Sequence, residues 1–417
     1  PRLGILPMGT GNLLARNLYI PVSDVAACVN IALNGAGQDV DAIEMTTTGT
    51  TGEETEHTFF VMSGAGFDAL VIVGDFASRG SEIQMRKVKK ILDAGLPADV
   101  RLIMTMASHE YMTDGEENAL RRFDEIFGLT PDTHAVINGF DFIAVTTTRG
   151  CHFDDKKRGF VSAELEKAAE RDGKKPIFFF QHPHITDTVY GSINWGEDEI
   201  TDILINYPQI VDFSGHSHAP INDPRSAHQR HFSAFGTGTL SYFELDEFDK
   251  THGTIPPEDS SAAQFLIVEA DAQGRVRVYP YDVLGSRFFP YTWVIDEPWN
   301  IDSFKYTDAR YVTAEKPYFE NAGISVENIT ADGCDITFTQ ATGKERPDSY
   351  DIYILDSDGL IKKHMNITSR YYLSDMPAAL TEHIGGLKAG TEYTIKIVAN
   401  SFWRTRSDAL TARFATL

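Results

Sequence analysis

Cysteine is scarce in this chain of 417 residues, which contains Cys28, Cys151 and Cys334 at widely separated positions. Three distant cysteines cannot form a disulfide framework, and they leave the compartment open. Long apolar runs are also missing, although 42% of the residues are hydrophobic. None of the runs approaches the ~20 residues that a membrane-spanning helix requires. We therefore expect buried cores and no membrane span.

Positive charge is in short supply, with 37 Lys and Arg against 60 Asp and Glu and a net charge of −23. Nucleic acids and anionic membranes attract basic surfaces, so general binding to either is not expected. The chain begins Pro1-Arg2-Leu3, without an initiator Met or a signal peptide. We interpret it as a fragment, or as a chain processed or assembled in an unusual way.

The length favours two or three domains. We predict a first segment at 1–69, a layered domain at 70–296, a Pro- and aromatic-rich connector at 297–320, and a final domain at 321–417. In the first segment, 3–6 reads as a strand, a helix starts after Asn12, and 46–56 reads as a polar hairpin loop. We further expect residues 3–18 to dock as an edge of the following sheet.

The second segment alternates strands with helices, which implies an α/β layered fold. Apolar runs predict strands, and 3.6-residue spacing predicts helices. The predicted strands are 70–73, 101–106, 177–180, 210–214, 264–270 and 275–279, and the predicted helices are 82–93 and 163–171.

Residues of metal-ligand type directly follow several of these strands. They form four blocks: Gly74-Asp75, His109-Glu110, Gln181-His182-Pro183-His184 and Gly215-His216-Ser217-His218. Ligands at the carboxyl ends of strands share one edge of a sheet. Two divalent cations bridged by a carboxylate can hydrolyse a phosphate ester. An ordinary loop role remains the alternative for each histidine, and we favour it for His184.

The four blocks in this order resemble the calcineurin-like metallophosphoesterases. The resemblance implies a layered β-sandwich flanked by helices and a dinuclear site for Mn, Fe or Zn. It implies Asp75 as the bridging ligand, with His182 and His216 on one metal and His218 on the other. It also implies that His109 assists the leaving oxygen, and that the substrate is a small phosphorylated molecule.

Two departures from the family pattern bear on activity. The opening Asp-x-His block has no counterpart before Gly74, so one metal position retains little beyond Asp75 and His218. Ser108 stands where the family has an asparagine ligand, and its hydroxyl is shorter and weaker. We expect that activity, if present, is impaired.

The amino-terminal residues resemble a fragment of the bacterial diacylglycerol kinase catalytic domain. Gly9-Thr10-Gly11-Asn12 matches its second glycine block, and 59–69 matches a later one. Such a loop can present backbone N–H groups to phosphate. The upstream glycine block for ATP is missing, so we favour a structural turn.

Short alternating strands from residue 321 predict a β-sandwich, with examples at 335–339 and 393–397 separated by turns such as 356–359. Residues 386–400 resemble a fibronectin type III domain, with Tyr393 at the position of a tyrosine corner. We expect Phe402 and Trp403 to pack in the core or between domains.

Three interpretations follow. The chain is a metal-dependent phosphomonoesterase or phosphodiesterase, a protein related to lipid kinases, or a catalytically inactive binding protein. We favour the first. The sandwich suggests an extracytoplasmic location for residues 70–417, whereas the kinase-like fragment suggests the cytoplasm. The sequence leaves the oligomeric state open.

Overall fold

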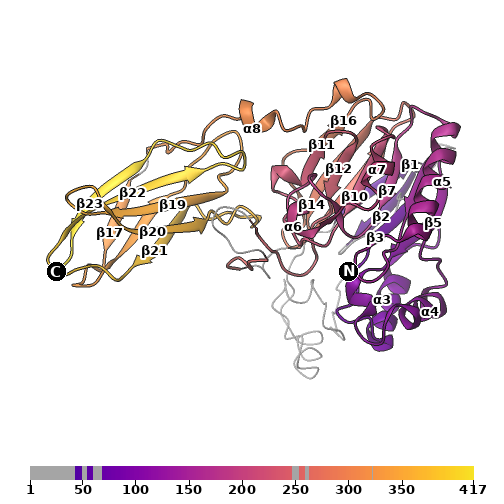
Figure 1. The fold of residues 1–417 in the computed structure, drawn as a ribbon, viewed down its shortest axis with the longest axis horizontal. Helices are drawn as coiled ribbons and strands as arrows, with labels where there is room; N and C mark the ends of the chain where they lie inside the picture. Colours follow the sequence, from indigo (N-terminus) through magenta and orange to yellow (C-terminus); the bar gives the residue numbers. More distant parts are fainter. Residues whose placement is uncertain (1–42, 49–53, 60–67, 247–252, 259–262, 322) are drawn as a thin grey trace.

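A computed structural model describes residues 43–48, 54–59, 68–246, 253–258, 263–321 and 323–417 (Figure 1). The glycine block Gly9–Asn12 and the expected strand and helix of residues 3–18 lie outside these ranges. The hairpin that follows them is described. Strands β1 (Ile43–Thr48) and β2 (Glu54–Phe59) pair antiparallel, with Ile43 opposite Phe59. Most of the predicted polar loop at 46–56 is therefore strand, because its threonines are β-branched and favour extended backbone.

A six-stranded sheet forms the centre of the layered domain, with the strand order β11-β12-β10-β7-β6-β5. Its inner strands run parallel, and its two edge strands are antiparallel to their neighbours. The strands are β5 (Thr133–Ile137), β6 (Phe140–Ala144), β7 (Ile177–Phe180), β10 (Ile210–Ser214), β11 (Ala227–Gln229) and β12 (Ser233–Gly236). Strands β7 and β10 are buried throughout, as expected for parallel strands covered on both faces.

Helices cover one face of this sheet, and a second sheet covers the other (Figure 1). Val161 and Leu165 of α5 (Asp155–Arg171) pack with Leu204 of α7 (Thr201–Leu204) against Phe179. The opposite face packs on a four-stranded sheet. That sheet contains β13 (Gln264–Ala270), β14 (Val276–Asp282), β15 (Arg287–Phe288) and β16 (Trp293–Ile295). The predicted α/β layering of this segment is thus present.

A separate parallel pair, β3 (Ala69–Val73) and β4 (Arg101–Thr105), carries the first site residues. Helices α3 (Glu82–Gly95) and α4 (Glu116–Phe127) pack against this pair of strands. Met85 of α3 and Phe123 of α4 form one core cluster with Met104 of β4. The short elements of this domain are η1 (Ser108–Tyr111), β8 (His184–Ile185), α6 (Ser192–Trp195), β9 (Gly196–Glu197) and η2 (Pro224–Ser226).

The connector holds η4 (Ile301–Ser303) and α8 (Arg310–Thr313) and leads to a sandwich of seven strands. Three strands pair in the order β17-β18-β21 and four in the order β20-β19-β22-β23. These strands are β17 (Ile324–Glu327), β18 (Cys334–Thr339), β19 (Ser349–Leu355), β20 (Ile361–Thr368), β21 (Ala379–Ile384), β22 (Glu392–Asn400) and β23 (Leu410–Ala415). The Tyr393 hydroxyl accepts a hydrogen bond from Lys388 N at 3.0 Å, which confirms the tyrosine corner.

The sandwich extends from one side of the layered domain (Figure 1), and a buried interface joins the two. Phe402 and Trp403 pack there with Tyr371, Phe243 and Ala219, so the expected interdomain packing is present. A buried ion pair crosses the same interface. The Arg225 guanidinium binds Asp223 at 2.5 Å and reaches Asp348 of the sandwich at 3.4 Å. Because Ala219 follows His218 directly, the interface abuts the last histidine block.

None of the helices in the described part of the chain combines the length and apolar character that crossing a bilayer requires.

Candidate metal centre

The candidate ligands follow the carboxyl ends of three strands. Asp75 comes after β3, His182 after β7 and His216 after β10. The backbone bends sharply at these positions. Asp75 has φ of 51°, His216 of 67° and His218 of 53°. Left-handed backbone at non-glycine residues is strained and clusters at functional sites. The turns aim these side chains at one edge of the sheets.

Four of the predicted residues form a chain of direct contacts. Nε2 of His182 lies 2.9 Å from Oδ2 of Asp75 and 3.1 Å from Nδ1 of His216. The backbone N–H of His109 donates to Oδ1 of Asp75 at 3.0 Å, and Nε2 of the same residue lies 3.9 Å from Oδ2. The structure therefore brings Asp75, His109, His182 and His216 together.

Backbone carbonyls fix the tautomers of three histidines. Nδ1 of His182 lies 2.7 Å from the Val73 carbonyl, Nδ1 of His109 lies 2.8 Å from that of Ser78, and Nδ1 of His218 lies 3.1 Å from that of Tyr242. A carbonyl oxygen only accepts, so each Nδ1 carries the proton and donates it. In His182 and His218 this arrangement leaves Nε2 as the nitrogen for a metal, which is the usual support for a ligating histidine. In His109 it leaves Nε2 facing the site.

The charges of the site act on one another. Burial would raise the pKa of Asp75, but the charge and hydrogen bond of His182 hold it well below its usual range. Burial lowers the pKa of His216 to about 3, with the charge of His182 contributing, and burial also lowers the pKa of His218. Burial would lower the pKa of His182, but the charge and hydrogen bond of Asp75 raise it. The site therefore offers an anionic carboxylate, two neutral imidazoles, and a third imidazole that must lose a proton before it binds a cation.

Two glycines in the site make room for their neighbours. Gly74 has φ of +89°, and a Cβ there would lie 3.0 Å from Nδ1 of His182. Gly80 has φ of +63°, and its Cβ would lie 1.9 Å from the Glu110 carbonyl oxygen. Left-handed backbone and close approach both require glycine here. Gly74 belongs to the first block that the sequence singled out.

Glu110 has a role that sequence reasoning did not assign. Its side chain is fully buried and accepts three backbone N–H groups: Asp75 at 2.9 Å, Ala77 at 2.9 Å and Ala107 at 3.0 Å. Burial raises the pKa of Glu110 to about 7, and the charge of Asp75 adds to this effect. The carboxylate ties the loop after β3 to the loop after β4. Its position next to His109 was the available signal.

Cys151 is the second residue that the sequence analysis missed. Its Sγ lies 3.4 Å from Nε2 of His216, and it is hydrogen-bonded to Ser108. Burial raises the pKa of the Cys151 thiol to about 12. Ser108, predicted as a weak ligand, is thus a neighbour of this thiol. The cysteine follows no strand and belongs to none of the family blocks, so no sequence signal identified it.

His184 lies in the core rather than in a loop. Nδ1 is 2.8 Å from the Ser214 hydroxyl and Nε2 is 2.7 Å from the Ser217 hydroxyl, and burial lowers the pKa of His184 to about 3. The expected loop was wrong, because His184 is buried in β8, but its hydrogen-bonded ring has the structural role that was favoured. It supports Ser217, between His216 and His218.

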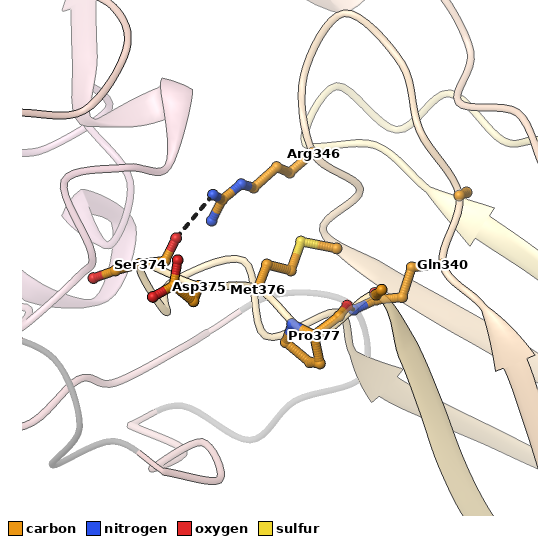
Figure 2. A pocket seen from close by; sticks show the side chains of 8 residues that line it. Gln340, Arg346, Ser374, Asp375, Met376 and Pro377 are labelled. Atoms are coloured by element: carbon orange, nitrogen blue, oxygen red, sulfur yellow. Dashed lines mark hydrogen bonds between the residues drawn. The ribbon is translucent and has the colours of Figure 1, made fainter. Parts of the chain in front are cut away.

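A hollow of about 410 Å³ in the sandwich is lined by Gln340, Arg346 and Met376 among others, and by none of the candidate ligands (Figure 2). The Arg346 guanidinium points toward it but donates to the carbonyls of Tyr371, Leu373 and Ser374. Asp375 adds an acidic group that pairs with Arg287 at 2.6 Å. Because the Arg346 guanidinium already donates to three carbonyl oxygens, we do not assign an anion site to this hollow.

Comparison with known proteins places these residues in context. Residues 54–220 match the family model for calcineurin-like phosphoesterases, and residues 1–45 match that for the diacylglycerol kinase catalytic domain. No curated protein matches the chain.

Solved structures similar to this chain include a two-domain fibronectin type III segment from chicken tenascin, at 14% identity and a TM-score of 0.20. The match covers 34% of this chain and 65% of that one. A human collagen alpha-1(XX) fibronectin domain matches at 12% identity and a TM-score of 0.19, covering 25% and 86%. The resemblances predicted from the sequence are thus confirmed: residues 54–220 match the calcineurin-like phosphoesterases and residues 1–45 a fragment of a diacylglycerol kinase domain.

Proposed function

We propose that this chain hydrolyses phosphate esters with the help of a divalent metal ion. The observation that carries the proposal is the contact chain Asp75–His182–His216, in which the donor atoms lie 2.9 Å and 3.1 Å apart. Oxygen and nitrogen donors of this kind suit a divalent cation. The match of residues 54–220 to a phosphoesterase family supports the same reaction.

Each donor has a definite role in this proposal. Asp75, His182 and His216 would hold the first cation, and His182 would first have to lose a proton. Asp75 and His218 are the described donors for a second cation, as in the dinuclear site expected from the family, with Mn, Fe or Zn as candidates. Ser108 is too weakly basic to replace the expected asparagine.

Catalysis would depend on the arrangement of this chain's own groups. When bound, a divalent cation neutralises the phosphoryl charge and makes water more acidic. His109 has 37% of its side chain exposed, and Nδ1 donates to the Ser78 carbonyl. Its Nε2 faces Asp75 and the open side of the site. That nitrogen is placed to protonate the departing oxygen of a small phosphate ester.

The domain limits and the compartment belong to the same proposal. We assign residues 70–296 to the catalytic domain, 297–320 to the connector and 321–417 to the sandwich, with 1–69 as a separate kinase-like segment. The phosphoesterase family match begins at residue 54, in β2, which supports a start of this domain before residue 70. An extracytoplasmic location for residues 70–417 is consistent with the accessory sandwich.

The decisive test is elemental analysis of the purified chain, paired with hydrolysis of a generic aryl phosphate in added Mn²⁺. We expect His216→Ala to abolish bound metal and hydrolysis, because it removes a donor at the centre of the contact chain. His383→Ala, on the exposed surface of β21, serves as the control and should change neither. Unchanged metal content in His216→Ala would contradict the site assignment.

A further inference from the structure

Three side chains from separate segments converge beside the expected ligands. Cys151, His182 and His216 each bring one donor atom, and these atoms lie within 4.8 Å of one another. In a tetrahedral zinc site, with Zn–N of about 2.0–2.1 Å and Zn–S of about 2.3 Å, neighbouring donors lie about 3.3–3.6 Å apart. The 3.4 Å between Sγ of Cys151 and Nε2 of His216 falls in that range, which makes Nε2, rather than the Nδ1 that faces His182, the nitrogen of His216 for this cation.

The loop that carries Cys151 is rigidly built. Thr148 and His152 pair antiparallel across it, with N···O distances of 2.7 Å and 3.0 Å. Arg149 and Gly150 take positive φ at the tip, 48° and 97°, which turns the chain back. The Thr147 hydroxyl also donates to the Gly150 carbonyl at 2.6 Å. These hydrogen bonds therefore fix the position of the Cys151 thiol next to the histidines.

Neighbouring contacts anchor the same loop from outside. Glu199 lies 2.8 Å from Nδ1 of His152 and accepts the Phe153 N–H at 3.0 Å. Phe153 is buried in the core under α5. On the other side, the Trp195 ring meets the His216 ring edge-on, with centroids 4.9 Å apart. These contacts hold the segment after Cys151 and the ring of His216 in place.

We propose that Cys151 is a metal ligand, which together with His182 and His216 forms a one-sulfur, two-nitrogen site for a single thiophilic cation of the zinc class. The proposal rests on the proposed function for the two histidines and adds the thiolate. Asp75, whose Oδ2 lies 2.9 Å from Nε2 of His182, remains the fourth donor of this cation, as in the proposed function.

The added sulfur changes which metal is preferred. Thiolate favours zinc over manganese or magnesium, which prefer oxygen donors. On binding, Sγ exchanges its proton for the cation, the proton leaves to water, and no electrons are transferred. The thiolate takes the place next to Ser108, where the expected amide ligand is missing.

Cobalt provides a test that does not depend on activity. The full chain is freed of metal with a chelator and titrated with Co²⁺ while its absorption spectrum is recorded. We expect a thiolate-to-cobalt charge-transfer band in the near ultraviolet and weak visible bands of tetrahedral intensity. Cys151→Ser should lose the near-ultraviolet band, whereas Cys334→Ala, in the sandwich core, should keep it.

Zinc affinity and thiol protection give a second readout. We expect the zinc affinity of Cys151→Ser to fall about 100-fold or more, because loss of an outer partner alone lowers affinity 10–100-fold. In the unmodified chain, Zn²⁺ should protect Cys151 from iodoacetamide, as located by mass spectrometry, so the result does not depend on a folded variant.

The outcomes separate the two proposals. The cysteine ligand would be overturned if cobalt binds without the thiolate-to-cobalt band. It would also be overturned if iodoacetamide alkylates Cys151 equally with and without zinc. Either result would leave the proposed histidine site unaffected. Failure to bind cobalt or zinc at all would overturn both proposals.

Discussion

The Glu110 carboxylate accepts the backbone N–H of Asp75 at 2.9 Å, although the two residues belong to different strand-loop units. The same Oε2 accepts the Ala107 N–H at 3.0 Å. One buried side chain thus fixes the distance between the loop that carries Asp75 and the loop that carries His109. The candidate metal centre depends on this support as much as on its ligands.

Removing that support should damage stability and metal binding together. Glu110→Ala leaves three buried N–H groups without their acceptor, and each such group costs about 1–3 kcal/mol. We expect a loss of at least about 3 kcal/mol in the free energy of unfolding, measured by urea denaturation. Glu110→Gln keeps one acceptor oxygen and should lose about half as much. Equal stability of the two variants would contradict this role.

Gly74 offers a test of the close packing around His182. A Cβ at Gly74 would crowd the ring at 3.0 Å from Nδ1 and force left-handed backbone on alanine. We expect Gly74→Ala to lower the free energy of unfolding by about 2 kcal/mol or more and to weaken metal affinity, as measured by calorimetric titration.

The matched control for this variant is Gly359→Ala in the sandwich. Gly359 has φ of +79°, and a Cβ there would meet no atom within 4 Å. It should lose about 1–2 kcal/mol from backbone strain alone and leave metal affinity unchanged. A similar loss of metal affinity in both variants would show that crowding of the His182 ring by a Cβ at position 74 does not affect metal binding.

Buried parallel strands were the part of the fold that the sequence predicted best. The runs at 177–180 and 210–214 coincide with β7 and β10, because continuous apolar stretches of this length signal strands covered on both faces. Helix α5 begins at Asp155, earlier than the predicted start at residue 163. Its first turn carries Lys156, Lys157 and Arg158, and even the buried Lys157 is a charged residue paired with Asp132, so hydrophobic spacing could not reveal it.

The residues of the candidate site likewise fall into some that the sequence predicted and some that it did not. Asp75, His182 and His216 lie in blocks that directly follow strands, and strand ends determine where their side chains gather. Cys151 and Glu110 reach the site through tertiary contacts with residues distant in sequence, 65 positions away for Cys151 and His216 and 35 for Glu110 and Asp75. For Cys151 the local sequence gave no sign of such a contact, and for Glu110 it gave only the position next to His109.

The two domains should unfold as one unit because of the ion pair at their interface. The Arg225 guanidinium bonds Asp223 and Asp348 and lies 4.0 Å from the Tyr190 ring centre. Breaking a buried pair by removing one partner costs about 3–5 kcal/mol. We expect Arg225→Ala to lower the melting transition of the layered domain and to separate it from that of the sandwich in calorimetry.

Arg413→Ala, on the exposed side of β23, is the control for the loss of an arginine and should change the melting profile little. A single unshifted transition in Arg225→Ala would mean that apolar packing alone couples the domains.

Asp212 should make the stability of the layered domain depend on pH. Burial raises the pKa of Asp212 to about 8, against hydrogen bonds from Gln181 and Ser214, so the carboxyl is protonated at neutral pH. The unfolded chain releases this proton near pH 4. Stability is therefore fully present below about pH 4 and is lost as pH rises through about 8, by up to about 1.4 kcal/mol per pH unit.

Asp212→Asn should remove this contribution and, because it replaces a neutral acid with a neutral amide, change stability by less than about 1 kcal/mol at pH 5. Urea midpoints measured at several values between pH 5 and pH 8 would then fall more steeply in the unmodified chain than in Asp212→Asn. Asp408→Asn, on a side chain that is 95% exposed, controls for a lost surface carboxylate and should follow the unmodified chain. Parallel midpoint curves for Asp212→Asn and the unmodified chain would mean that Asp212 ionises alike in the folded and unfolded states.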